Sequence, residues 1–437
     1  MNFFWEKNDL KDPSVGKGKL TVLGLQHTFT MFGATILVPI ILSEFGMSIS
    51  VALFMAGVCT LLFHVVTKGG VPIFLGSSFA FIAPIVAAAS AYGFESALGG
   101  IAVAGLIYLV FSIMVYFLGA AKIINWFPPV ITGSIIMVIG LVLAPVAIDM
   151  AGTGGGGEIT LGNWLIALMS FSIVVIVSVF FKGFFKALPV LIGIVISYLI
   201  AVIITITGIA PLIDFSPIAN AAWFGFPEFT VAKFDYRAIM IVAPVAICTM
   251  VEHIGDVMAI SSICDKQFIK KPGLHRTLIG DGLSSYLSAM FGGPANTTYS
   301  ENTGVLALTR QFNPNIMRIA AGFAILLSLV PKLSAIISTI PTAIIGGISI
   351  VLFGMIASIG ARTLVDNKVD FHQPRNLIIS ATVLVLGIGG AIVPITIGSV
   401  RFELYGMALA AIIGIILNQI LPGKFKYGEE AKEANKE

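Results

Sequence analysis

Four acidic side chains, Glu252, Asp256, Asp281 and Glu301, lie within or between strongly apolar stretches, whereas most other acids lie in polar connections or near the ends of the chain. A charge at the centre of a bilayer costs at least about 2.5–3.5 kcal/mol, so acids kept at that depth usually face a cavity or a partner and take part in function. Carboxyl groups in such surroundings can bind protons and can accept hydrogen bonds from a polar solute.

Glu252 and Asp256 are four residues apart, so their side chains share one face of a helix. Two carboxylates this close in a medium of low dielectric do not both ionise, and we expect the pair to hold a proton, as proton coupling requires. The alternative is structural: each acid could be a neutral hydrogen-bonding group within the helix bundle. Asp281 could also cap or pair with the basic segment 265–276.

Two histidines, His27 and His253, also lie inside apolar stretches. His27 could pair with Asn302 or with one of the acids. For both histidines the alternative is a structural hydrogen bond without a chemical role.

The types of residue near the acids indicate the kind of solute. The flat rings of Phe79 and Tyr299, the carboxyl groups of Glu252 and Glu301, and free backbone groups would suit a small, planar, nearly neutral molecule with donors and acceptors. A nucleobase fits this description better than an inorganic ion.

The composition places these residues in a membrane. Of 437 residues, 57% are hydrophobic and 11% are charged, and the mean hydropathy is +1.01. Soluble proteins carry about 25% charged residues, so the chain is not a soluble enzyme, a disordered protein or a nucleic-acid binder. The three cysteines have no metal-ligand spacing, and the sequence predicts buried thiols, no metal site, no cofactor and no catalytic residues.

Fourteen apolar segments predict an all-α polytopic membrane protein, because a bilayer core about 30 Å thick needs roughly 20 apolar residues per helix. The segments lie near 20–43, 48–67, 72–92, 96–119, 127–150, 163–181, 187–209, 237–263, 277–292, 297–309, 315–337, 341–361, 376–396 and 403–421.

The basic residues indicate the orientation. If both termini are cytoplasmic, 21 of the 25 Lys and Arg residues fall on the cytoplasmic side, as the positive-inside rule requires. An error of one segment would scramble this division. We therefore expect a multi-pass protein of the cytoplasmic membrane, and the basic charge is a signal of topology rather than of nucleic-acid binding.

Two of the fourteen segments, the third and the tenth, are poor helices. The third opens with Pro72 and β-favouring residues, and the tenth contains the polar stretch 293–304. Non-helical backbone survives at membrane depth only where protein or a wet cavity satisfies its polar groups, so both segments predict a short extended piece followed by a half-helix.

Similar features recur in the two halves of the chain. Gln26-His27 and Glu252-His253 are 226 residues apart, and Phe79 and Glu301 are 222 apart. Because seven segments make one half, the halves must be inverted. Inverted repeats with interrupted helices that meet at the midplane are typical of secondary transporters, whereas a channel would need a continuous pore.

The segment from Glu301 to Arg310, Glu-Asn-Thr-Gly-Val-Leu-Ala-Leu-Thr-Arg, resembles the signature of the nucleobase–ascorbate transporters, also called the nucleobase:cation symporter-2 family. Gln26-His27, the stretch 76–81 and Glu252-His253-Ile254-Gly255 resemble other landmarks of this family. The resemblance covers about residues 20–421. The Glu that opens the signature is similar to that of bacterial uracil permeases, where xanthine and urate carriers have Gln.

The resemblance implies a core domain that moves against a gate domain, usually in a homodimer embedded in membrane lipid. The core would contain residues 20–119 and 237–338, and the gate residues 120–236 and 339–421. Segments 1–19 and 422–437 would be cytoplasmic tails.

The resemblance also implies roles for particular residues. Glu252 and Glu301 would hydrogen-bond the base, with Asp256 joining them in proton coupling. The backbone around Phe79 and Ser300 would meet the carbonyl groups of the base. The remaining residues would line the pocket (Ala34, Ser78, Tyr299), support it (His27, Asn302, His253, Asp281) or form the gate (Phe353).

Four positions depart from the uracil-permease pattern or lean toward purine carriers. Asp256 replaces a His, Ser300 replaces a usual Gly, Phe353 replaces a Tyr found in some members, and Asp281 resembles an acid of xanthine and urate carriers. The resemblance therefore favours proton-coupled uracil uptake, with xanthine or another purine as the alternative. An anion exchanger of the same fold class is a more remote alternative.

Overall fold

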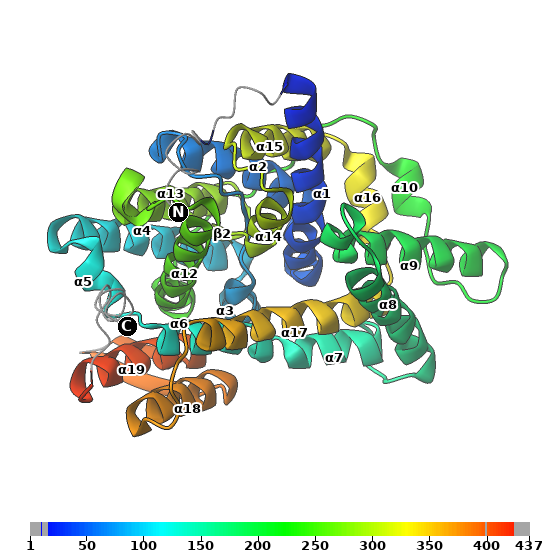
Figure 1. Ribbon diagram of the computed structural model, residues 1–437. Helices are drawn as coiled ribbons and strands as arrows, with labels where there is room; N and C mark the ends of the chain where they lie inside the picture. The colour runs from blue at the N-terminus through cyan, green and yellow to red at the C-terminus, as the bar shows by residue number, and fades with distance from the viewer. Residues whose placement is uncertain (1–9, 11–15, 398–399, 424–437) are drawn as a thin grey trace.

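The computed structural model describes residue 10 and residues 16–397 and 400–423. Most of both expected tails, 1–9, 11–15 and 424–437, lies outside these residues. The described chain is mostly helical and contains two pairs of short strands (Figure 1).

The helices follow the predicted segments closely. They are α1 (Lys17–Ile41), α2 (Ile49–Val66), α3 (Ile82–Tyr92), α4 (Phe94–Leu118), α5 (Ala120–Ile124), α6 (Pro129–Val142), α7 (Ala144–Thr153), α8 (Leu161–Phe180), α9 (Pro189–Ile206), α10 (Ser216–Asn220), α11 (Tyr236–Val242), α12 (Ala246–Cys264), α13 (Leu274–Met290), α14 (Ser300–Thr309), α15 (Asn315–Ser328), α16 (Pro331–Ser338), α17 (Thr342–Asp366), α18 (Pro374–Ile388) and α19 (Gly406–Ile420). The strands are β1 (Leu75–Ser77), β2 (Asn296–Thr298), β3 (Ile392–Ile397) and β4 (Val400–Tyr405).

Within the described residues, eight helices are long and apolar enough to cross a membrane. A ninth is added if α15 and α16 are counted as one element, although they are bent by 80° relative to each other. The sequence predicted a single segment over 315–337. The bend lies at Leu329 and Val330, where Pro331 cannot continue the preceding helix.

A second difference lies near the C-terminus, where the sequence predicted an unbroken segment over 376–396. Instead α18 ends at Ile388, and Gly389 and Gly390 lead into the antiparallel hairpin of β3 and β4. Residues 392–397 are mostly β-branched and contain a proline, so they favour a strand over a helix.

The strands β1 and β2 form a buried antiparallel pair in which Leu75 lies opposite Thr298 and Ser77 lies opposite Asn296. Two further backbone bonds extend the ladder, from Ser78 N to Ala295 O at 2.9 Å and from Tyr299 N to Phe74 O at 3.1 Å. The pair therefore satisfies backbone groups that are not part of any helix.

Each of these strands leads directly into a helical segment. β1 is followed by the 3-10 turn η2 (Phe79–Phe81) and α3, and β2 is followed by α14. Because the strands are antiparallel, the two helical segments start at opposite ends of a ladder only three residues long, and the chain leaves the pair in opposite directions.

Two hydroxyl groups hold the strands to neighbouring helices in the same way. Thr60 Oγ1 of α2 accepts a bond from Leu75 N at 2.9 Å and donates one to Leu75 O at 3.3 Å. Ser285 Oγ of α13 accepts a bond from Asn296 N at 3.1 Å and donates one to Asn296 O at 3.0 Å.

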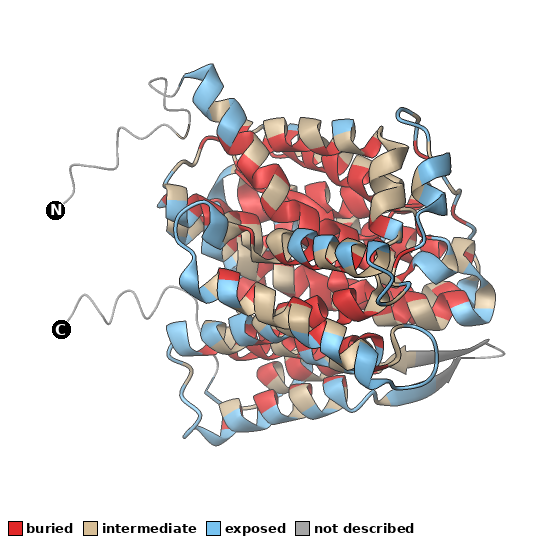
Figure 2. Cartoon of the chain, turned by 90° about the vertical axis from the view of Figure 1, so that its right-hand side faces the viewer, coloured by how far each residue is buried: buried red, intermediate tan, exposed pale blue. Residues whose placement is uncertain are grey.

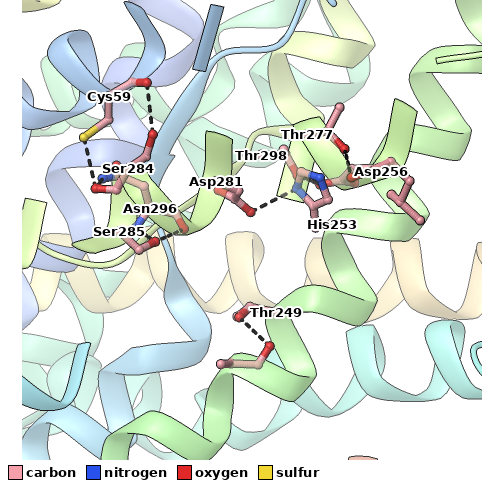
Figure 3. A network of polar contacts seen from close by, with 12 residues as sticks. Cys59, Thr249, His253, Asp256, Thr277, Asp281, Ser284, Ser285, Asn296 and Thr298 are labelled. Atoms are coloured by element: carbon pink, nitrogen blue, oxygen red, sulfur yellow. Dashed lines mark hydrogen bonds and ion pairs between the residues drawn. The ribbon is translucent and has the colours of Figure 1, made fainter. Parts of the chain in front are cut away.

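The residues just before these hydroxyls, Cys59 and Ser284, bond to each other. Cys59 Sγ donates to Ser284 O at 3.2 Å, and Ser284 Oγ donates to Cys59 O at 3.1 Å (Figure 3). These partners are 225 residues apart in the sequence. Equivalent positions in the two halves of the chain thus make equivalent contacts.

The helices pack in two groups. In the first, α1, α2, α12 and α13 contact the strand pair, α15 packs on α1 and α2, and α4 packs on α13; in the second, α17 packs on α6, α7 and α8, and α18 packs on α6 and α19. Small residues permit close packing within the first group: a Cβ on Gly105 of α4 would lie 2.5 Å from the carbonyl oxygen of Gly282 on α13.

Buried residues fill the centre of the molecule, and exposed residues lie around its outside (Figure 2). Large apolar side chains are nevertheless exposed on the outer helices, among them Leu165 and Leu168 of α8 and Leu199 and Ile203 of α9. A protein that leaves so much apolar surface outside its core is suited to lipid, and the chain is an integral membrane protein.

The start of α11 carries a cap outside the apolar helices. Asp235 accepts bonds from the backbone N–H of Arg237 at 2.9 Å and from its guanidinium at 2.8 and 3.1 Å. These bonds to Arg237 lower the pKa of Asp235. The cap is therefore present at neutral pH and is lost only as the pH falls into the acid range.

Replacing Gly105 by Val should destabilise the packing of α4 on α13 by about 1–3 kcal/mol, because the added atoms overlap the backbone of Gly282. Thermal unfolding of the purified protein in detergent measures this change. Gly322→Val in α15 is the matched control, because no atom lies within 4 Å of a Cβ at that position. Equal unfolding temperatures for the two variants would show that the helices are not packed as described.

Candidate functional site

The residues predicted to do chemistry come from four regions that meet at the strand pair. α12 packs against β2, α13 and α14, while α1 packs against β1 and α14. The acids of α12 and α14 are thereby placed near the point where α14 begins. Neither η2 nor α14 has a side-chain cap from its own N-cap residue, Ser78 or Tyr299.

Glu252 and Glu301 are the two acids predicted to bind the solute. Both residues are partly buried. The Oε2 atom of Glu252 is buried and has no hydrogen-bond partner among the described residues. Glu301 is the second residue of α14, whose N-cap residue makes no side-chain cap. Glu252 therefore offers an acceptor atom that the described residues leave unused.

The carboxylate of Asp256 bonds to hydroxyl groups of β2 and α14 and not to Glu252. Its Oδ1 accepts a hydrogen bond from Ser300 Oγ at 2.8 Å, and its Oδ2 accepts one from Thr298 Oγ1. No hydrogen bond in the described part of the chain joins Asp256 to Glu252. The four-residue spacing predicted a pair of carboxylates, whereas the structure directs Asp256 to hydroxyl groups of β2 and α14.

His253 and Asp281 form a pair that the sequence did not predict. Nδ1 of His253 lies 2.9 Å from Oδ2 of Asp281, and both side chains are completely buried (Figure 3). Successive residues of a helix project about 100° apart, so His253 faces α13 while the adjacent Glu252 faces elsewhere. The expectation that Asp281 could cap or pair with the basic segment 265–276 is wrong, because its close partner is His253.

The sequence predicts that His27 could pair with Asn302 or with an acid, and the structure shows the contact with Asn302. Asn302 Nδ2 lies 3.1 Å from Nδ1 of His27 and donates to the backbone oxygen of the same residue at 3.2 Å. Both side chains are buried. The contact ties α14 to α1 and leaves Nε2 of His27 without a partner among the described residues.

Tyr299 connects three elements through its hydroxyl group. The hydroxyl donates to Ser77 O at 3.1 Å and accepts from Thr35 Oγ1 at 3.3 Å. Its ring lies directly against Gly76, where any side chain would overlap the ring. The sequence predicts Tyr299 as a residue that lines the pocket. The structure shows that its hydroxyl group also links β1 and α1 by hydrogen bonds.

The ring of Phe79 packs edge-to-face on Phe353 of α17, with centroids 5.8 Å apart and an angle of 74° between the planes. This contact joins the two groups of helices beside the strand pair. Ser78, adjacent to Phe79, is buried and its hydroxyl has no partner among the described residues. Ala34 is also buried, next to Thr35 on α1.

Several structural residues near the site escaped sequence reasoning, namely Thr35, Thr60, Ser285 and Thr298. Each is a hydroxyl residue that bonds to a different element of the fold, and hydroxyl residues are common enough that position alone does not mark them. The four acids and the two histidines were predicted because ionisable side chains are rare in apolar segments. No group of three or more His, Cys, Asp or Glu side chains able to hold a metal occurs among the described residues.

Comparisons with known proteins identify the class and then the family. Residues 18–396 match a family described as the Permease family, so the protein is a transporter rather than an enzyme. The chain belongs to this family, the nucleobase–ascorbate transporters, which confirms the membership that the sequence signature indicated.

Several uracil permeases are similar in sequence to this chain over nearly its whole length. The chain is 44% identical to the uracil permease of Bacillus caldolyticus over 434 residues, covering 98% of this chain and 97% of the relative. It is 43% identical to the uracil permease of Bacillus subtilis (strain 168), covering 91% of each. It is 40% identical to the uracil permease of Escherichia coli (strain K12), covering 91% and 90%.

Solved structures with a similar fold are more distant in sequence. The transmembrane domain of the cyanobacterial bicarbonate transporter BicA has a TM-score of 0.65 at 16% identity, covering 91% of this chain and 97% of that one. SLC26A9 has a TM-score of 0.66 at 11% identity, covering 92% and 64%. At such identities the likeness shows the fold alone.

Tyr299→Phe should lower stability by about 1–2 kcal/mol, because two buried hydrogen bonds are lost while the ring is kept. Tyr116→Phe is the matched control, since Tyr116 is 66% exposed. Thermal unfolding in detergent compares both with the parent protein. If both variants unfold at the parent temperature, the hydroxyl of Tyr299 does not hold the strands together.

Proposed function

We propose that this protein takes up uracil together with protons across the cytoplasmic membrane by alternating access. The observation that carries the proposal is the 40–44% identity to uracil permeases over at least nine-tenths of the chain. The unused acceptors of Glu252 and the nearby acid Glu301, beside two uncapped helix starts, support it independently.

The proposed architecture has fourteen membrane segments in two inverted halves, with the third and tenth segments interrupted. The pairing of β1 with β2 supports it, as do the equivalent roles of Thr60 and Ser285. In this arrangement residues 20–119 and 237–338 form the core domain, and residues 120–236 and 339–421 form the gate domain. The two groups of packed helices agree with this division.

Uracil is flat and neutral, and it carries two N–H donors and two carbonyl acceptors. In the proposed site the carboxylates of Glu252 and Glu301 accept its N–H groups. The free backbone N–H groups at the starts of η2 and α14 donate to its carbonyls, because the N-terminus of a helix favours negative partial charge. Ser78 offers a further hydroxyl, and Phe79 and Tyr299 offer apolar ring surface.

Proton coupling follows from the same carboxyl groups. Two acids that share a region of low dielectric hold a proton more readily than one acid in water, and a bound base changes that balance. Glu252 and Glu301 would take up protons from one side with uracil and release them to the other. Asp256 is the third acid that the sequence predicts for proton coupling, and both of its oxygen atoms accept bonds from hydroxyl groups.

Alternating access requires the core and the gate to separate on one side at a time. The contact of Phe79 with Phe353 joins them next to the site, so we expect this pair to part when uracil enters or leaves. We further expect a homodimer with both termini in the cytoplasm, surrounded by membrane lipid and with no nucleic-acid partner.

A purine such as xanthine is the second candidate substrate. Asp256 and Asp281 favour it, because the resemblance places acids at both positions in xanthine and urate carriers. Anion exchange is a weaker alternative: BicA and SLC26A9 share the fold, but the carboxylates of Glu252 and Glu301 disfavour an anionic solute.

Uptake of radiolabelled uracil into cells that lack their own uracil transport tests the proposal. We expect uptake that a protonophore abolishes and that excess unlabelled uracil inhibits more strongly than xanthine or guanine does. Uptake that survives the protonophore would contradict proton coupling. Stronger transport of xanthine than of uracil would move the substrate to the purines.

Glu301→Gln should weaken uracil binding by about tenfold or more, because a charged acceptor is replaced by a neutral amide while the volume is kept. Binding of radiolabelled uracil to the purified variant measures the change, with thermal unfolding as a check of folding. Glu95→Gln is the matched control, since Glu95 makes an exposed ion pair with Lys233. Parent affinity in Glu301→Gln would mean that the site is misplaced.

A further inference from the structure

Asp256 differs from the other two predicted proton-coupling acids because both of its oxygen atoms are engaged. Ser300 Oγ donates to Oδ1 at 2.8 Å, and Thr298 Oγ1 donates to Oδ2. Hydrogen bonds to a carboxylate are stronger than those between neutral groups. A carboxylate bridged in this way is suited to hold its two donors at a fixed separation.

The two donors lie on either side of the junction between β2 and α14. Thr298 is the last residue of β2, Ser300 is the first of α14, and Tyr299 between them is the N-cap. Tyr299 makes no side-chain cap. Asp256 belongs to the neighbouring helix α12, and its bonds to Thr298 and Ser300 hold this junction in place. Ser300 is the residue directly before Glu301.

We propose that Asp256 is a positioning residue, which through Ser300 and Thr298 sets the distance between Glu252 and Glu301 and does not carry the transported proton. Glu252 and Asp256 share α12, so a bond from Asp256 to the start of α14 also fixes Glu301 relative to Glu252. The inference rests on the proposed function only in taking uracil as the molecule that the two glutamates bind.

A double-mutant cycle tests the proposal. Uracil binding is measured for the parent, Asp256→Asn, Ser300→Ala and the double variant, with Ser300→Thr as the control that keeps the hydroxyl. We expect each of the first two single changes to weaken binding about tenfold. The double variant should be no weaker than Asp256→Asn alone, because the same bond is already lost. Ser300→Thr keeps the hydroxyl donor and should therefore bind uracil more tightly than Ser300→Ala does.

A second readout separates positioning from proton transfer. In proteoliposomes, the pH dependence of uracil uptake by Asp256→Asn should keep the parent profile at lower affinity, whereas Glu252→Gln should change the profile. Parent affinity with a lost pH dependence in Asp256→Asn would overturn the proposal and make Asp256 a proton carrier. Additive losses in the double variant would overturn it as well.

Two further outcomes remain decisive. If Asp256→Asn does not fold, Ser300→Ala and Ser300→Thr answer the question alone, and equal affinities for these two would overturn the proposal. If the parent protein binds no uracil, the proposed function fails. The cycle is then measured by thermal unfolding, where additive effects of the changes at 256 and 300 would overturn the positioning role.

Discussion

The site depends on the hydrogen bonds between two strands of three residues each. Where a chain leaves helical geometry inside a membrane protein, its N–H and C=O groups need new partners, and here each interrupted segment supplies the partners of the other. Thr60 and Ser285 fasten the strands to the helices on either side. Because the strands are antiparallel and only three residues long, η2 and α14 begin at opposite ends of a short ladder, and α14 begins next to α12 with its acids. Neither half of the chain builds this arrangement without the other.

The polar groups around the strand pair divide into those that hold the fold and those that it leaves free. His253 with Asp281, His27 with Asn302, and Asp256 with the hydroxyls of Thr298 and Ser300 join elements that are distant in the sequence. Glu252 and Ser78, by contrast, keep buried oxygen atoms without a partner among the described residues. A solute with its own donors can satisfy such atoms, and this is why a transport protein retains polar groups that cost stability.

Much of this fold could be predicted from the lengths of the apolar segments and from the rarity of charged residues within them. The helix positions and the extended pieces at 75–77 and 296–298 follow from such signals. The sequence could not show which way each side chain on α12 turns, so it missed the contact of His253 with Asp281 and the bonds that Asp256 accepts from Thr298 and Ser300. It also missed the β3–β4 hairpin and the bend before Pro331, because hydropathy measures apolar content and does not separate a strand or a bent helix from a straight one.

A structure of the protein determined with uracil bound is the most direct test of this account. We expect the base to lie between the starts of η2 and α14, with its N–H groups within hydrogen-bonding distance of the carboxylates of Glu252 and Glu301. Asp256 should remain bonded to Ser300 and should not contact the base. A base bound elsewhere in the molecule, or one held by Asp256 while Glu252 and Glu301 face lipid, would contradict it.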